Sequence, residues 1–272
     1  MTQQQKAAAF RALHERPGAF IIANAWDAGS AKLLTAAGFG AIATTSLGFA
    51  ATLGKIDGTV SRDEVLANCL QIAQATPLPV SADLENCYAR APRAAAATIT
   101  LAAQAGMVGG SIEDASGDAA NPIYDFALAV ERVHAAVEAA RALRFPFVLT
   151  ARAENFWHGR RDMDDTLRRL QAFERAGADV LFAPGVRTID EIRTVCSALG
   201  KPVNVVMSAA DPSLTVAQLA EAGVKRISFG GALTRYALGA AMNAAREMKE
   251  QGSFRWLTTA LPGAELKRLL GG

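Results

Sequence analysis

The most constraining feature of this sequence is an alternation of eight short apolar segments with longer stretches of helical periodicity. Continuous apolar runs without strict alternation are typical of strands buried on both faces of a parallel sheet. We expect such strands at Phe20–Ala23, Ala41–Thr44, Pro79–Ala82, Met107–Ile112, Phe147–Ala151, Val180–Ala183, Val203–Val206 and Arg226–Phe229. The helices between and after them are expected at Ala28–Ala37, Arg62–Ala75, Arg93–Ala105, Ile123–Arg144, Met163–Ala176, Thr188–Leu199, Thr215–Ala222 and Ala232–Gln251.

This alternation predicts a single-domain (β/α)8 barrel, an α/β fold of the TIM type. Helices run into a glycine just before the next strand at Gly38, Gly106, Gly177 and Gly223, and glycine supplies the left-handed cap that ends a helix. A doubly wound open sheet is the alternative, but it usually has fewer strands and a glycine-rich turn after its first strand. Because no linker divides the chain, we predict one domain over residues 1–272 with a C-terminal helical tail from about residue 232.

Composition narrows the classes of partner. The chain is 51% hydrophobic and carries 28 Lys+Arg against 26 Asp+Glu, a net charge of +2 without any basic block. We therefore expect no nucleic-acid and no membrane partner. The three cysteines lie far apart, and the N-terminal segment is polar and lacks the apolar stretch of a secretory signal. These features predict a cytoplasmic protein with reduced thiols.

Acidic side chains gather where the predicted strands end, the edge at which barrels of this type carry their chemistry. They are Asp57, Asp83, Glu85, Glu113 and Asp114. Close carboxylates repel one another unless a cation is present, and oxygen-only ligation favours Mg2+, or Mn2+, over Zn2+. Asp83 and Glu85 are two residues apart in an extended segment, so both side chains can face the barrel mouth. The alternative is that these acids cap helices or form salt bridges.

Arg152 ends the fifth predicted strand after a run of apolar and small residues. A guanidinium at that place suits bidentate binding of a substrate carboxylate beside a metal. Its alternative role is to pair with Glu154 or with another acid of the rim.

Four segments resemble the isocitrate lyase/phosphoenolpyruvate mutase superfamily in order and spacing. They are Thr45–Asp57 (TSLGFAATLGKID), Ser81–Tyr88 (SADLENCY), Ser111–Asp114 (SIED) and Thr150–Glu154 (TARAE). The resemblance extends from about Phe20 to Ala245. Members of this superfamily include oxaloacetate decarboxylase, methylisocitrate lyase and phosphonopyruvate hydrolase.

The resemblance implies a barrel whose last helix is exchanged between subunits of a homodimer or homotetramer. It also implies an Mg2+ ion held by four carboxylates, several of them through water, with Glu113 and Asp57 sharing the catalytic work with Arg152. Backbone amides near Thr45, Ser46 and Leu47 would bind a substrate carboxylate, which Arg152 would hold or polarise. The implied metal ligands are Asp83, Glu85, Glu113 and Asp57.

Two departures from the family pattern affect the expected reaction. Cys87 and Ala89 stand where the family has glycines around Tyr88, which puts the shape of that loop in question. The loop Ala115–Pro122 contains no Lys, Cys or His, whereas isocitrate- and methylisocitrate-type lyases carry a cysteine proton donor there. Cys87 and His158 are alternative donors, although Cys87 also fits a small packed residue and His158 an exposed loop. His14 fits an exposed helix position.

We therefore expect an Mg2+-dependent lyase that cleaves a C–C bond of a small 2-oxo or 2-hydroxy carboxylate, by decarboxylation or retro-aldol cleavage, through an enolate-like intermediate. An enolate must be protonated, and Asp118 is the only acid of the Ala115–Pro122 loop. This favours oxaloacetate-type decarboxylation, in which solvent can supply the proton. The alternatives are a P–C bond hydrolase or mutase that acts on phosphonopyruvate-like substrates, and a non-catalytic carboxylate-binding barrel.

Overall fold

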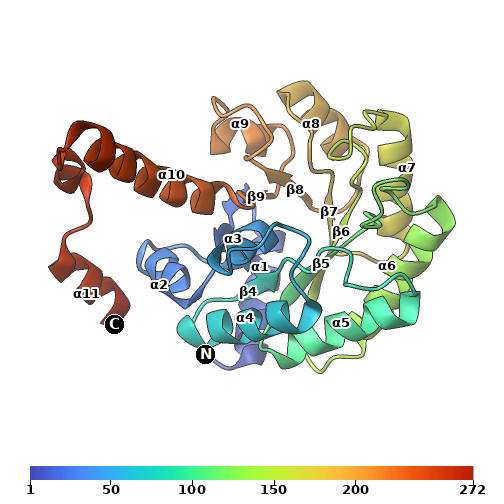
Figure 1. Ribbon diagram of the computed structural model, residues 1–272. Coiled ribbons are helices and arrows are strands. Elements are labelled where there is room, and N and C mark those ends of the chain that lie inside the picture. Colours follow the sequence, from blue (N-terminus) through green and yellow to red (C-terminus); the bar gives the residue numbers. More distant parts are fainter. Residues whose placement is uncertain (272) are drawn as a thin grey trace.

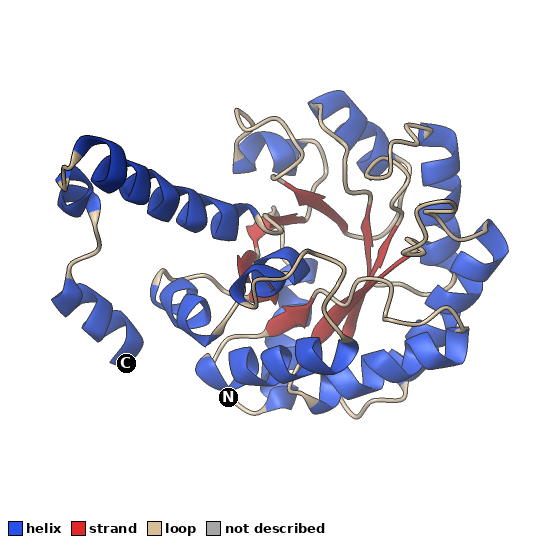
Figure 2. Ribbon diagram, in the orientation of Figure 1, coloured by secondary structure: helices blue, strands red, loops and turns tan. Residues whose placement is uncertain are grey.

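The computed structural model describes residues 1–271 and arranges nine parallel strands around one axis, with helices outside them (Figures 1 and 2). The strands are β1 (Phe20–Ile21), β2 (Ala23–Ala25), β3 (Ile42–Thr44), β4 (Val80–Ala82), β5 (Gly109–Glu113), β6 (Val148–Arg152), β7 (Val180–Phe182), β8 (Val203–Val206) and β9 (Arg226–Ser228). Their order in the sheet is β1-β9-β8-β7-β6-β5-β4-β3-β2.

The first expected strand is divided in two, and this division closes the barrel. β1 pairs with β9, whereas β2 pairs with β3. Between them, the Ile22 amide donates to the Ile227 carbonyl at 2.8 Å. The eight predicted strand positions and the TIM-type fold are therefore confirmed, and the open-sheet alternative is wrong.

The expected helices are present with small shifts at their ends. They are α2 (Ala28–Ala36), α4 (Arg62–Ala75), α5 (Pro92–Gln104), α6 (Phe126–Arg141), α7 (Met163–Arg175), α8 (Ile189–Ser197), α9 (Val216–Glu221) and α10 (Ala232–Arg246). The expectation for α6 began too early, because Ile123 forms an isolated antiparallel bridge with Ala115. α10 continues into a π-helical turn at Glu247–Gln251.

Two helices were not expected from the sequence. α1 (Gln3–Glu15) precedes the first strand, and Thr2 caps it in a capping box with Gln5. α3 (Ser46–Thr52) follows β3, and Thr45 is its N-cap. Few residues of α1 form an apolar face, and α3 has only 7 residues. The pattern of the sequence therefore does not distinguish either helix from a loop.

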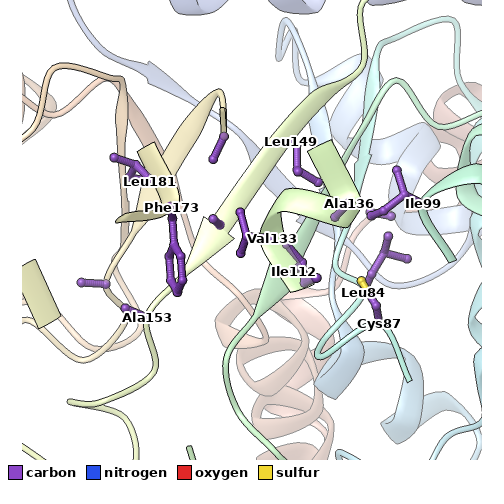
Figure 3. Packing of buried hydrophobic residues seen from close by; sticks show 14 of the residues in the cluster. Leu84, Cys87, Ile99, Ile112, Val133, Ala136, Leu149, Ala153, Phe173 and Leu181 are labelled. Atoms are coloured by element: carbon purple, nitrogen blue, oxygen red, sulfur yellow. The ribbon is translucent and has the colours of Figure 1, made fainter. Parts of the chain in front are cut away.

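The main core lies between the barrel and its ring of helices. Figure 3 shows Ile112 of β5 and Leu149 of β6 near Val133 and Ala136 of α6, and all four side chains belong to one buried cluster. Strand side chains alternate between this outer layer and the barrel interior. On β6, Leu149 packs outward, so Thr150 and its neighbours at i±2 face inward.

A second, smaller apolar cluster closes the end of the barrel at which the strands begin. Phe10 of α1 is completely buried there among Phe20, Val108 and Val148. Gly109 permits this packing, because a Cβ at that residue would lie 2.7 Å from Phe10 Cε1.

His14 of α1 also lies at this end, and the expectation that it is exposed was wrong. The residue is 8% exposed, its Nδ1 lies 2.9 Å from the Phe10 carbonyl oxygen, and its ring meets Phe10 and Phe20 edge-on. Burial, with the nearby positive charge of Arg226, lowers the pKa of His14 to about 3. The imidazole is therefore neutral at physiological pH.

The C-terminal segment projects away from the barrel (Figure 1). α10 extends outward, and after a 3-10 turn at Arg255–Thr259 the chain ends in α11 (Gly263–Gly271), which contacts α2. Large apolar side chains on this segment are exposed: Tyr236, Leu238, Met242, Phe254, Leu257 and Leu261. Within residues 1–271, none of the helices combines the length and the apolar character needed to cross a membrane.

Candidate functional site

A cavity of about 190 Å³ opens at the carboxyl ends of the strands and continues into the barrel. Four segments bring the predicted residues there: the β3–α3 junction, the loop between α3 and α4, the end of β4 and the end of β6. Those that line the cavity are Thr45, Ser46, Leu47, Asp57, Asp83 and Arg152. Glu85 and Glu113 do not line it, although both are electrostatically coupled to the residues that do.

Arg152 is the centre of an ion-pair network at this rim. Its Nη1 lies 3.0 Å from Asp83 Oδ1 and 3.1 Å from Glu113 Oε2, and its Nε donates to Glu154 Oε1 at 2.7 Å. Burial alone would lower the pKa of Arg152, but the surrounding carboxylates raise it above its ordinary value. The guanidinium also lies over the ring of Phe182, at 5.2 Å from the centroid. Arg152 therefore pairs with Glu154, the alternative role that the sequence left open, and it also lines the cavity.

The acids of the rim outnumber this single arginine. Burial, together with the charge of Asp83, raises the pKa of Glu85 to about 7. Burial also raises the pKa of Glu113 well above its ordinary value and that of Asp57 to a smaller extent. Each of these carboxyl groups is hard to ionise while the others are charged, so the rim has an excess of negative charge that a cation would relieve.

The donor chemistry of the rim fits a hard divalent cation. The four predicted ligands offer only carboxylate oxygens, which suit Mg2+. Within residues 1–271, however, no three Asp, Glu, His or Cys side chains are already grouped closely enough to hold an ion. The guanidinium of Arg152 lies between Asp83 and Glu113 instead. In this arrangement one oxygen each of Asp83 and Glu113 contacts the guanidinium of Arg152.

The segment that carries Thr45, Ser46 and Leu47 is fixed by close packing. The Ser46 amide donates to Asp83 Oδ2 at 3.1 Å, and Thr44 Oγ1 accepts from the Asp83 amide at 2.8 Å. At Gly48, a Cβ would lie 2.5 Å from Thr234 Oγ1 and 2.6 Å from Thr45 Cγ2. This glycine allows α10 to start directly beside α3, so the beginning of α10 forms one wall of the cavity together with Gly231 and Ala232.

The loop after β4 has an unusual backbone. Glu85, Cys87 and Tyr88 have positive φ angles of 49°, 58° and 57°. Cys87 is not glycine, but it adopts the left-handed conformation that glycine favours. The loop therefore has a glycine-like backbone at Cys87 although the family glycine is replaced there. The Tyr88 hydroxyl donates to Glu85 Oε1 at 3.0 Å, so this strained turn positions a rim carboxylate.

One predicted acid and the candidate proton donors do not line the cavity. Asp114 pairs with Arg169 at 3.0 Å and accepts from the Glu154 amide, so it ties α7 to the barrel. Cys87 is completely buried, and burial raises the pKa of its thiol to about 12. His158 lies in an exposed turn. The pKa of Asp118, in the loop after β5, is lowered by hydrogen bonds from Ala120 and Asn121.

The sequence did not reveal a layer of polar side chains inside the barrel, one step below the rim. Its buried members that line the cavity are Asn24, Ser81, Ser111, Thr150, Asn204, Arg226 and Ser228. The available signal was spacing, because Ser81, Ser111 and Thr150 each precede a rim residue by two positions and therefore face the same side of their strand. Apolar neighbours on both sides concealed them within runs that looked uniformly buried.

Comparisons with known proteins agree with this geometry. A family model described as phosphoenolpyruvate phosphomutase matches residues 10–249. The 2-methylisocitrate lyase of Salmonella typhimurium is 30% identical over 259 residues, which covers 91% of this chain and 84% of that enzyme. A crystal structure from Burkholderia cenocepacia J2315, described only by the class lyase/mutase, is 56% identical with a TM-score of 0.97 and covers 99% of this chain and 97% of that one. Phosphonopyruvate hydrolase in complex with oxalate and Mg2+ is 28% identical with a TM-score of 0.85, over 100% of this chain and 95% of that one.

Proposed function

The chain belongs to the phosphoenolpyruvate phosphomutase family, within the isocitrate lyase/phosphoenolpyruvate mutase superfamily, and we propose that it is an Mg2+-dependent lyase acting on a small 2-oxo or 2-hydroxy carboxylate. It would cleave a C–C bond next to the carboxylate through an enolate-like intermediate. The observation that carries this proposal is the ion-pair network at the mouth of the cavity, in which Arg152 contacts the carboxylates of Asp83, Glu113 and Glu154.

Four carboxylates would hold the ion: Asp83, Glu85, Glu113 and Asp57. When bound, Mg2+ would supply Lewis-acid stabilisation for the negative charge that develops on the substrate oxygen. Mn2+ would suit the same donors. The Mg2+ and oxalate in the related phosphonopyruvate hydrolase complex support this cofactor and this type of ligand.

The side chains of the chain itself would orient the substrate. Arg152 would exchange its contact with Asp83 for one with the substrate carboxylate, one charge-assisted hydrogen bond for another. Glu113 would keep its contact with the guanidinium, and Asp57, which lines the same cavity, would help to hold the ion. Thr45, Ser46 and Leu47 line the cavity, and their backbone amides would contact the carboxylate end of the substrate.

The enolate formed by cleavage must be protonated, and the candidate proton donors of the chain favour decarboxylation over retro-aldol cleavage. Hydrogen bonds keep Asp118 ionised, and the Cys87 thiol is buried, so neither is placed to donate a proton. Solvent can protonate the enolate of a decarboxylation. Relatives of the chain include oxaloacetate decarboxylases, such as that of Pseudomonas fluorescens at 25% identity.

The test compares kcat/KM for oxaloacetate, methylisocitrate and phosphonopyruvate at saturating Mg2+, with identification of the products. We expect oxaloacetate to be the best of the three. A preference for methylisocitrate by tenfold, about 1.4 kcal/mol of transition-state free energy, would contradict this assignment. Faster turnover of phosphonopyruvate would favour the second candidate, a P–C bond hydrolase or mutase, which the phosphonopyruvate hydrolase relative supports. Oxalate binding without turnover of any substrate would favour a non-catalytic carboxylate-binding barrel.

We also propose that the enzyme is a cytoplasmic homodimer or homotetramer in which the last helices are exchanged between subunits. α10 leaves the barrel with Tyr236, Leu238 and Met242 exposed, and apolar surface of this extent is usually covered by a partner. Light scattering at micromolar concentration should give a dimer or a tetramer. A monomer would contradict the proposal.

A further inference from the structure

The polar layer inside the barrel contains a buried arginine. Interiors of barrels of this type are usually filled with bulky branched side chains. Here the cavity continues below the rim to Arg226 of β9, which is 6% exposed and lines the same cavity as Arg152. The two arginines come from different strands and lie at different depths, so the cavity has a cationic side chain at its floor in addition to Arg152 and Arg235 at its mouth.

The hydrogen bonds of Arg226 leave one of its donor groups without a partner. Its Nε donates to Asn204 Oδ1 at 2.8 Å, and its Nη2 donates to Thr150 Oγ1 at 2.9 Å. Its Nη1 is buried and has no hydrogen-bond partner. The neutral oxygens of Asn204 and Thr150 therefore hold the guanidinium in one orientation without neutralising its charge.

The surroundings of Arg226 also lack a counter-ion. Within residues 1–271 no carboxylate forms an ion pair with it. Of the other buried arginines, Arg169 pairs with Asp114 and Asp165, and Arg132 donates to backbone carbonyl oxygens. Below Arg226 lies His14, which is neutral, and above it Arg152 is already paired with the rim acids. Burial lowers the pKa of Arg226 to about 9, so the group is still cationic at neutral pH. An isolated buried charge is costly unless an oppositely charged group joins it.

The depth of Arg226 defines the size of the anion that could reach it. Thr150, which accepts from Arg226, stands two residues before Arg152 on β6, and two residues of a strand span about 6.6 Å. A dicarboxylic acid of about four or five carbons covers such a distance, since each C–C bond is about 1.5 Å long. One carboxylate could then stay at the rim beside Arg152 while the other reaches the floor.

We propose that Arg226, oriented by Asn204 and Thr150, binds the distal carboxylate of a short dicarboxylic substrate and so selects dicarboxylates over monocarboxylates. This inference rests on the proposed function, since it takes the rim as the site of the reacting carboxylate. Arg226 would make two charge-assisted hydrogen bonds to that group, one of them from the unpartnered Nη1. The substrate would thus lie along the barrel axis.

Calorimetric titration of the metal-loaded protein with matched pairs of acids tests this proposal. The pairs are malate against 2-hydroxybutyrate and 2-oxoglutarate against 2-oxovalerate, which differ only in a distal carboxylate replaced by methyl. We expect at least one dicarboxylate to bind tenfold or more tightly than its partner. Equal affinities in both pairs would overturn the proposal, and this measurement needs no variant.

Variants then assign the preference to the floor of the cavity. Arg226→Met should abolish the preference, and Arg226→Lys should retain part of it, with folding checked by circular dichroism. Arg235→Met is the matched control, because it removes a positive charge from an exposed position at the mouth of the same cavity. A preference that survives in Arg226→Met, or that disappears equally in Arg235→Met, would overturn the assignment.

Oxalate separates this inference from the proposed function. It is too short to reach the floor, so its Mg2+-dependent binding reports on the rim alone. Oxalate binding with no dicarboxylate preference would leave the proposed function intact and refute the role of Arg226. A dicarboxylate preference that depends on Arg226, in a protein without Mg2+-dependent turnover, would support the role of Arg226 and refute the proposed function.

Discussion

The two ends of the barrel satisfy opposite physical requirements. At the end where the strands begin, α1 seals the barrel with Phe10, and the His14 side chain packed beside Phe10 is neutral. At the other end, carboxylates crowd around Arg152, and the backbone of the β4 loop is strained at Glu85, Cys87 and Tyr88. The first end is arranged for packing, whereas the second keeps charge and strain that packing alone would remove.

The contrast teaches that the stability of this fold and its chemistry depend on separate residues. Burial favours the neutral form of a side chain at both ends. For His14 the neutral form is the deprotonated one, and for Glu85 it is the protonated one. The two ends should therefore respond to mutation and to pH in opposite directions, which the following predictions test.

The largest expected effect is at the acidic end. Glu85→Gln should lower Mg2+-dependent kcat/KM by at least about 100-fold, since even outer-shell partners of a metal contribute 10–100-fold. The free energy of unfolding of the metal-free variant should equal or exceed that of the parent above pH 7, because ionised Glu85 is buried and is repelled by Asp83. Steady-state kinetics and urea denaturation in EDTA measure the two quantities.

The matched control for this substitution is Glu131→Gln, at an exposed position of α6. It should change neither activity nor stability by more than about 0.5 kcal/mol. Full turnover of Glu85→Gln, or of the parent protein in EDTA, would show that the metal assignment is wrong.

The sequence predicted the barrel because its strands and helices differ in pattern over many residues. Val203–Val206 and Arg62–Ala75 were predicted with the observed bounds, since turn residues bracket the strand and Ser61 caps the helix. α1 was missed because only a few of its residues, among them Phe10 and His14, face the barrel. Its role in sealing the barrel is a tertiary contact that no local pattern encodes.

The site shows the same difference between what a local sequence pattern encodes and what depends on tertiary contacts. Asp57, Asp83 and Arg152 were predicted to meet because residues that follow parallel strands share one edge, and the structure brings them to one cavity. The contact of Arg152 with both Asp83 and Glu113 depends on side-chain conformation and could not be read from spacing. Arg226 was missed because it begins a predicted strand, a position that the search for residues at strand ends did not cover.

The next largest effect is the pH dependence of stability at the end of the barrel that α1 seals. The pKa of His14 is about 3 in the folded protein against 6.5 when unfolded, so the unfolded state binds more protons between these values. Stability contributed by this residue is therefore lost as the pH falls below 6.5, by about 2 kcal/mol at pH 5. We expect the difference in unfolding free energy between the parent and His14→Gln to fall by that amount from pH 7 to pH 5.

Denaturant titrations of both proteins at the two pH values measure this difference. His134→Gln, at an exposed position of α6, is the control and should show no such change. Glu85→Gln should show the opposite sign in EDTA. Folding raises the pKa of Glu85 to about 7, so the parent gains stability relative to that variant as the pH falls from 7 toward 4.5. A parallel response of the His14 and Glu85 variants would contradict the contrast between the two ends.

The smallest effect isolates backbone strain at the acidic end. Cys87 and Cys69 are both completely buried, but Cys87 has φ of 58° whereas Cys69 lies within α4. Glycine in a helix is about 1 kcal/mol less stable than alanine, and the left-handed conformation costs a residue with a Cβ about 1–2 kcal/mol. Cys69→Gly should therefore be less stable than Cys69→Ala, and Cys87→Gly more stable than Cys87→Ala. Urea midpoints at equal m-values measure both differences, and the same order at the two positions would show that the β4 loop stores no strain.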